Sequence, residues 1–149
     1  MTSYVSAHLR RKIESRANNL CEYCLIHEDD TFLGCQVDHI IAEKHGGTTE
    51  SSNLSYACTF CNQAKGSDVG SVVGGSDEFT RFFNPRADSW IDHFVLESVL
   101  IQALTPVGEA TANILGFNKE ERILERAILS SVGRYPSAQA LAHISPYDQ

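Results

Sequence analysis

Four of the five cysteines form two Cys-x-x-Cys pairs, Cys21 with Cys24 and Cys58 with Cys61. Pairs of thiolates at this spacing, present twice, are typical of a tetrahedral zinc site. The pairs are separated by 33 residues (25–57), so the metal ion closes a long loop and its binding contributes to folding. Redox activity of a Cys-x-x-Cys motif is the rival interpretation, which a second pair disfavours. The fifth cysteine, Cys35, is predicted to be a buried structural thiol.

The overall charge restricts how the chain can bind nucleic acid. The formal net charge is −7, whereas affinity for DNA depends largely on neutralising phosphates. The segment up to Leu20 is locally basic, because it holds Arg10, Arg11, Lys12 and Arg16 against the single acid Glu14. Any phosphate contacts are therefore expected to come from a local patch.

Length and hydrophobicity indicate one globular domain, 1–149, in a cytoplasmic protein. The 149 residues are 42% hydrophobic and 21% charged, as in ordinary globular domains. No apolar run reaches the roughly 20 residues needed to cross a bilayer, and the first residues lack the pattern of a signal peptide. The expected location is the cytoplasm.

The hydrophobic pattern predicts an α+β fold. An N-terminal helix within 1–20 presents Val5, Leu9 and Ile13 on one face. Two short strands, 32–41 and 53–57, and a helix from Cys58 to Lys65 make a ββα finger within 21–66. A flexible loop is expected at 67–78, because that segment is rich in Gly, Ser and Val.

The remaining segment, 79–149, is expected to be a scaffold. Residues 90–94 and 99–104 are predicted to pair as a β-hairpin. Thr105-Pro106 begins a helix that ends at Gly116, and a second helix follows from about Asn118 to Gly133.

A set of polar residues lies inside and beside the cysteine pairs, in a fixed order. Asp38-His39 is followed by the glycine turn Gly46-Gly47, by Asn53-Leu54, and by Cys58-x-x-Cys61-Asn62-x-x-Lys65. This ordered set resembles the HNH endonucleases, the ββα-metal nucleases, over about a third of the chain (21–65). The tail from Phe83-Asn-Pro-Arg86 onward has a looser resemblance to stand-alone bacterial HNH proteins.

Phosphodiester hydrolysis requires a base, a nucleophilic water and positive charge near the phosphate. His39 suits the base, since imidazole titrates near neutral pH. Asp38 and Asn62 offer oxygen ligands, which favour Mg²⁺ or Mn²⁺. The resemblance implies that Asp38 and Asn62 hold one such ion, that His39 activates water, and that Asn53 braces the loop that positions the imidazole. Adjacent residues of a flat strand point to opposite faces, so Asp38 and His39 can share a site only on a twisted strand end.

Three cations are predicted to contact substrate phosphates: Lys65, one helical turn beyond Asn62, and more weakly Lys44 and Arg86. The predicted function is therefore metal-dependent hydrolysis of DNA, with a structural Zn²⁺ and a catalytic Mg²⁺ or Mn²⁺. The resemblance implies 5′-phosphate and 3′-hydroxyl products. The alternative is a non-catalytic zinc module that binds nucleic acid or a protein partner, which the acidic charge favours.

Overall fold

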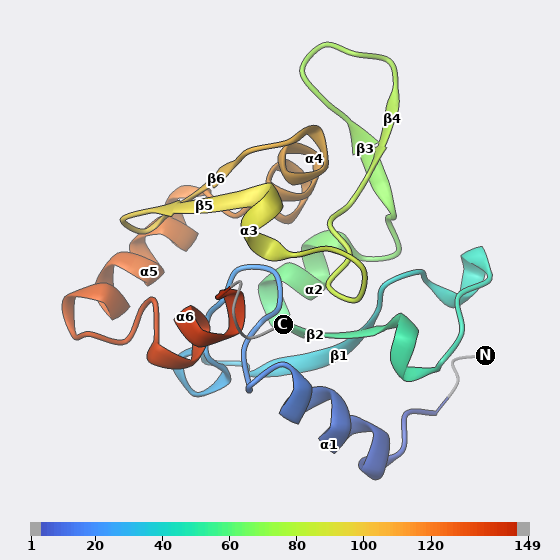
Figure 1. Ribbon diagram of the computed structural model, residues 1–149, viewed down its shortest axis with the longest axis horizontal. Coiled ribbons are helices and arrows are strands. Elements are labelled where there is room, and N and C mark those ends of the chain that lie inside the picture. The colour runs from blue at the N-terminus through green and yellow to red at the C-terminus, as the bar shows by residue number, and fades with distance from the viewer. Residues whose placement is uncertain (1–3, 146–149) are drawn as a thin grey trace.

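The computed structural model describes residues 4–145 and confirms the α+β class (Figure 1). The first helix, α1 (Ala7–Arg16), begins where the Ser6 hydroxyl accepts a hydrogen bond from the amide of Leu9 at 3.1 Å. Its apolar face buries Ile13 completely. The helix contacts β2 of the ββα finger.

The finger consists of β1 (Cys35–His39), β2 (Leu54–Cys58) and α2 (Thr59–Lys65). The strands are antiparallel, with Cys35 opposite Cys58 and His39 opposite Leu54. All of β2 is buried, because it lies between β1 and the segments that cover its other edge. Three short 3₁₀ helices complete this half: η1 (Glu28–Asp30), η2 (Glu43–His45) and η3 (Ser51–Asn53).

The outer edge of β2, the edge away from β1, is closed by Glu22 and Arg16. The Glu22 carboxylate accepts a hydrogen bond from the amide of Tyr56 at 2.9 Å, and the Glu22 amide donates to the carbonyl of Tyr56 at 2.8 Å. Arg16 donates to the carbonyl of Leu54 at 2.7 Å. Arg86 forms an ion pair with Glu22 from the C-terminal half of the chain, so the two halves meet at this edge.

The segment expected to be a flexible loop contains one strand of a hairpin. β3 (Gly70–Val72) pairs with β4 (Phe79–Arg81) in antiparallel register. Gly70 is required there because a Cβ would lie 2.3 Å from the carbonyl oxygen of Thr80.

The predicted C-terminal hairpin forms, although its first residues are helical. α3 (Trp90–His93) precedes β5 (Phe94–Glu97), which pairs with β6 (Leu100–Ala103). The rings of Trp90 and Phe94 lie 5.1 Å apart in the core. Their four-residue spacing places both side chains on one side of a helical turn, which explains why the strand starts late.

Three helices finish the chain, where the sequence predicted two. α4 (Pro106–Leu115) and α5 (Glu120–Ser131) match the predicted pair. The third, α6 (Ala138–Ile144), begins where the Ser137 hydroxyl accepts from the amide of Ala140 at 3.0 Å. None of the helices in the described part of the chain is long and apolar enough to cross a membrane.

Candidate metal centre and catalytic pocket

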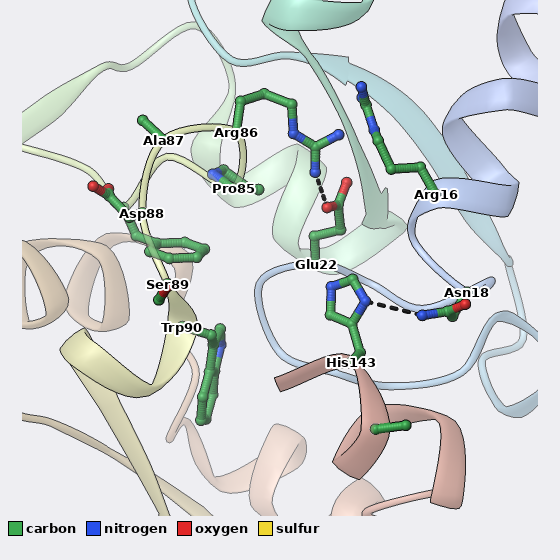
Figure 2. Close-up of a pocket in the computed structure, with 12 residues that line it drawn as sticks. Arg16, Asn18, Glu22, Pro85, Arg86, Ala87, Asp88, Ser89, Trp90 and His143 are labelled. Atoms are coloured by element: carbon green, nitrogen blue, oxygen red, sulfur yellow. Dashed lines mark hydrogen bonds and ion pairs between the residues drawn. The ribbon is translucent and has the colours of Figure 1, made fainter. Parts of the chain in front are cut away.

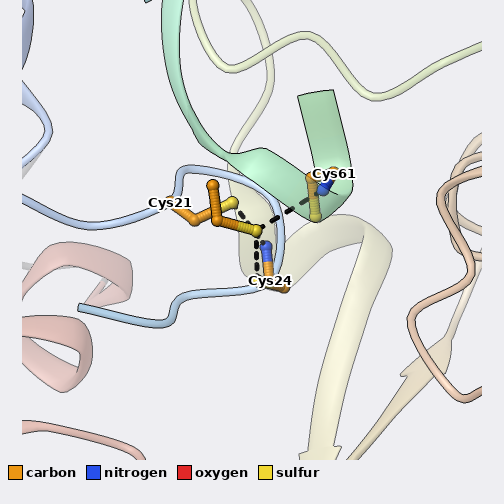
Figure 3. Close-up of side chains that lie close together, drawn as sticks. Cys21, Cys24 and Cys61 are labelled. Carbon is orange, nitrogen blue, oxygen red and sulfur yellow. Dashed lines mark hydrogen bonds between the residues drawn. The ribbon is translucent and has the colours of Figure 1, made fainter. Parts of the chain in front are cut away.

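The four paired cysteines converge in the interior, as Figure 3 shows for Cys21, Cys24 and Cys61. Within each pair, the first sulfur accepts a hydrogen bond from the amide of the second cysteine at 3.5 Å. Cys58 is the N-cap of α2 and Cys61 lies in its first turn. The antiparallel register of β1 and β2 thus brings the second pair back to the first.

The geometry of this cluster fits zinc. One sulfur from each cysteine lies within 4.8 Å of the others, and the sulfurs of Cys24 and Cys58 are 3.7 Å apart. A tetrahedral ion with the usual Zn–S bond requires sulfurs separated by about 3.8 Å. Complete burial raises the pKa of Cys21 well above its ordinary value, so a bound cation is needed to keep all four sulfurs ionised. The fifth cysteine, Cys35, is a buried free thiol, as predicted.

A buried arginine from the C-terminal half covers the cluster. Arg122, on α5, is 4% exposed and donates to the sulfurs of Cys24 at 3.2 Å and of Cys58 and Cys61 at 3.7 Å. Burial disfavours its charge, but the negative sulfurs outweigh that effect and raise the pKa of Arg122. Four thiolates around a divalent ion carry two surplus negative charges, and the guanidinium compensates part of that charge.

Asp38 and His39 lie at the end of β1 and border one pocket, together with Glu43, Lys44 and Ser67. Asp38 faces α2, where its Oδ2 lies 3.0 Å from Nζ of Lys65. The sequence left open how adjacent strand residues could share a site. The strand ends at His39, so both side chains line the same opening from different sides.

Lys65 is 2% exposed and therefore does not lie on a solvated helix face. Besides pairing with Asp38, its ammonium donates to the carbonyl oxygen of His39 at 2.9 Å. Burial raises the pKa of Asp38 and the Lys65 charge opposes that rise. The ammonium thus holds α2 against the strand end at the pocket.

The imidazole of His39 is held from the loop that follows it. Its Nε2 lies 2.9 Å from the hydroxyl of Thr49 and 3.5 Å from a carboxylate oxygen of Glu43. A ring nitrogen held beside a carboxylate and a hydroxyl favours the tautomer that carries its proton there. Nδ1 is then the nitrogen that can accept a proton.

Asn53 fixes the backbone of that loop. Its side-chain oxygen accepts from the amide of Ile41 at 2.9 Å, and its side-chain nitrogen donates to the carbonyls of Ile41 at 2.9 Å and Thr48 at 2.8 Å. Gly47 lies against the same backbone, where a Cβ would be 1.7 Å from the carbonyl oxygen of Ile41. The predicted glycine turn is thus required by close packing, and Asn53 occupies the place expected of a brace.

Asn62 lies on α2 one turn before Lys65, and its side-chain amide donates to the carboxamide of Gln36. Gln36 precedes Asp38 by two residues and therefore shares its face of β1. The structure thus places Lys65 opposite Asp38 and Asn62 opposite Gln36. Among the described residues, Asn62 is not part of the pocket lining.

The donor chemistry around Asp38 fits a hard divalent cation. Asp38 offers a carboxylate at the pocket, although its Oδ2 is already paired with Lys65, and a second carboxylate, Glu43, borders the pocket. Oxygen donors of this kind suit Mg²⁺ or Mn²⁺. Asn62 fits in chemistry, but it reaches the same ion only by giving up its hydrogen bond to Gln36.

The predicted phosphate contacts separate in space. Lys44 borders the pocket with Asp38 and His39, whereas Arg86 borders a different one. Sequence reasoning gave no role to Glu43, Thr49, Gln36 or Arg122. Glu43 follows His39 by four residues and could have been found by spacing, but Arg122 is 98 residues from Cys24 and no local pattern connects them.

Comparisons with known proteins bear on the finger alone. Residues 21–68 match the family model described as HNH endonuclease. Searches of curated proteins and of solved structures found no match. The matched residues contain both cysteine pairs, the strand end with Asp38 and His39, and the Asn53 brace. The resemblance predicted from the ordered motif is confirmed, because the match to the HNH endonuclease model covers residues 21–68.

Proposed function

We propose that the protein is a metal-dependent endonuclease that hydrolyses DNA phosphodiester bonds at the Asp38–His39 pocket. The observation that carries this proposal is the gathering of an imidazole, a carboxylate and two lysines at the strand end of a segment from a nuclease family. These are the groups that activate water and stabilise a phosphorane.

His39 is the proposed general base. With Nε2 directed to Thr49 and Glu43, Nδ1 accepts a proton from water as the water oxygen attacks phosphorus. The 3′ oxygen then leaves and takes a proton from solvent water, which gives the 5′-phosphate and 3′-hydroxyl ends that the family resemblance implies. Asn53 keeps the imidazole in place through the backbone after β1.

Asp38 and Asn62 are the proposed ligands of one Mg²⁺ or Mn²⁺. When bound, the ion supplies positive charge to a phosphoryl oxygen. Lys65 already stabilises the buried Asp38 carboxylate, and Lys44 at the pocket rim is positioned to contact a neighbouring phosphate. The zinc-binding cysteines hold β2 and α2 in register and take no part in the reaction.

The test is plasmid cleavage across a series of divalent metals. The wild-type protein is expected to nick or cut only when Mg²⁺, Mn²⁺ or a similar ion is added. His39→Ala is expected to lower the rate by roughly 10²–10⁴-fold, as loss of a general base does. His8→Ala, an exposed histidine on α1, is the matched control and should cleave as the wild type does. Equal cleavage by His39→Ala would eliminate the proposed base.

A non-catalytic zinc module is the second candidate, because a net charge of −7 limits affinity for nucleic acid. Metal content separates the two. The endonuclease should bind a second, oxygen-ligated ion that Asp38→Ala loses while zinc is retained. The module should bind zinc alone and never cleave.

A further inference from the structure

A second polar pocket lies on the far side of β2 from the Asp38–His39 pocket. Arg16 at the end of α1, Glu22, Arg86 from the turn after Phe83, and His143 on α6 all border it (Figure 2). We call it the arginine pocket. No sequence motif pointed to it, although Arg86 was a predicted phosphate contact.

The carboxylate oxygens of the arginine pocket all accept hydrogen bonds already. The two oxygens of Glu22 accept from the amide of Tyr56 and from Arg86. Asp88 accepts two hydrogen bonds from Arg81, at 2.7 and 3.2 Å, and one from the amide of Asn84 at 2.8 Å. An added cation would therefore compete with the arginines for these oxygens.

The guanidinium donors, in contrast, exceed the acceptors. Nε of Arg16 and Nη1 of Arg86 are both buried and have no hydrogen-bond partner among the described residues. Figure 2 shows the two guanidiniums facing each other above the Glu22 carboxylate. A buried donor without an acceptor is unfavourable, so an added acceptor near these two side chains would be stabilising.

The pKa shifts of Arg16 and His143 also indicate an excess of positive charge in the arginine pocket. Burial lowers the pKa of Arg16, and the nearby Arg86 charge lowers it further, while Glu22 opposes both effects. Burial and then Arg86 also lower the pKa of His143, whose ring lies 3.1 Å from the Asn18 side chain. Two guanidiniums thus share one carboxylate, and an added anion would relieve their repulsion.

We propose that the arginine pocket binds a phosphate group between the guanidiniums of Arg16 and Arg86. A phosphate offers several acceptor oxygens and suits arginine pairs better than a single carboxylate does. Its source is either the backbone of a nucleic acid or a free phosphate compound. The site goes beyond the proposed function, and only the nucleic-acid source rests on that function.

The position of the pocket favours a nucleic-acid backbone. Arg16 is bonded to the carbonyl of Leu54, and Leu54 lies directly opposite His39 in the sheet. Neighbouring strands are about 4.8 Å apart, so the carbonyl that Arg16 contacts lies on the strand next to His39. This closeness favours one nucleic acid as the ligand of both Arg16 and the Asp38–His39 pocket.

The first test is a titration with inorganic phosphate, followed by NMR on the zinc-loaded protein. The Nε–H signals of Arg16 and Arg86 are expected to shift saturably. Arg16→Gln, which removes the guanidinium and its charge, should weaken binding at least tenfold. Lys119→Gln removes an exposed charge outside the pocket and should bind as the wild type does.

Arg86 itself is not substituted, because its loss would leave the Glu22 carboxylate buried without its partner. The second variant therefore changes a different pocket residue. His143→Ala removes a pocket group whose ring contacts the side chain of Asn18, and should also weaken phosphate binding. Unfolding temperature and zinc content verify that each variant is folded. Absence of a saturable shift, or equal binding by Arg16→Gln and the wild type, overturns the proposal.

The second test identifies the source of the phosphate. The affinity of a short duplex is measured against salt concentration in the His39→Ala background, without added divalent metal. If the occupant is a backbone phosphate, Arg16→Gln should reduce the slope of log affinity against log salt by about one. An unchanged slope, with inorganic phosphate binding lost, assigns the pocket to a free phosphate compound. Neither outcome depends on cleavage, so failure of the endonuclease proposal is seen separately.

Discussion

The cysteine cluster and the Asp38–His39 pocket lie in one short segment but are built in opposite ways. The cluster is fully buried, and its sulfurs already lie at distances that suit one ion. The pocket is open, and its polar groups are engaged with neighbouring side chains: Asp38 with Lys65, Asn62 with Gln36, and His39 with Thr49. The difference fits the two proposed roles: a structural metal needs ligands that are already in place, whereas a catalytic pocket needs side-chain partners that a substrate or ion can displace.

Removing the metal from the cluster should have the largest effect. Structural zinc contributes about 10–16 kcal/mol in finger peptides, which equals or exceeds the roughly 5–15 kcal/mol stability of a typical domain. Chelation, or Cys58→Ser, is therefore expected to abolish cooperative unfolding followed by circular dichroism. Cys35→Ser, a buried cysteine outside the cluster, is the control and should keep its zinc. An unchanged melting temperature after chelation would show that the cluster is not a folding element.

Lys65→Met tests whether the ion pair between Lys65 and Asp38 stabilises the folded protein. The substitution leaves the Asp38 charge buried alone, which should cost about 3–5 kcal/mol in urea unfolding at neutral pH. Asp38→Asn combined with Lys65→Met removes both charges and should recover most of that loss. Full stability of the single variant would mean that the pair contributes nothing to the fold.

The same variant has a predicted pH dependence. Burial raises the pKa of Asp38 above its ordinary 3.8, and loss of Lys65 raises it further. The folded carboxyl then binds its proton more tightly than the unfolded one, so stability falls as the pH rises from 3.8 through the folded pKa. The deficit of Lys65→Met should therefore shrink at acidic pH, and a deficit independent of pH would point to lost packing.

Arg122→Met should have a smaller effect on the cluster. Loss of a group that hydrogen-bonds to metal ligands typically lowers metal affinity about 10–100-fold, because the charge of the tetrathiolate is no longer compensated. Competition with a chromophoric chelator measures the zinc affinity directly. Arg122→Lys keeps the charge and should recover part of it. Zinc affinity equal to that of the wild type in Arg122→Met would confine this arginine to packing.

The sequence predicted those parts of the molecule whose chemistry is local. Sequence spacing was enough to identify the two cysteine pairs, the glycine turn and Asn53. In the structure the cysteines cluster, Gly47 packs against backbone, and Asn53 bonds to the loop after β1. Contacts between distant segments could not be predicted. Glu22 and Arg86 are 64 residues apart, and either side chain alone is typical of an exposed surface.

The sequence predicted some helices better than others. The Pro106 start and Gly116 end of α4 were readable because both residues have strong backbone preferences. The short helix α3 was assigned to a strand, since aromatic and β-branched residues favour strands unless packing decides otherwise. Tertiary burial of Trp90 decided it here.

The closed outer edge of β2 has a consequence for how copies of this chain can assemble. Backbone groups on an open strand edge recruit further strands, which leads to sheet-extended dimers or fibres. Here the amide and carbonyl of Tyr56 are bonded to Glu22, and the carbonyl of Leu54 to Arg16. A second subunit therefore cannot join the finger by adding a strand along β2, and two coordinated cuts would require a pairing built from other surfaces.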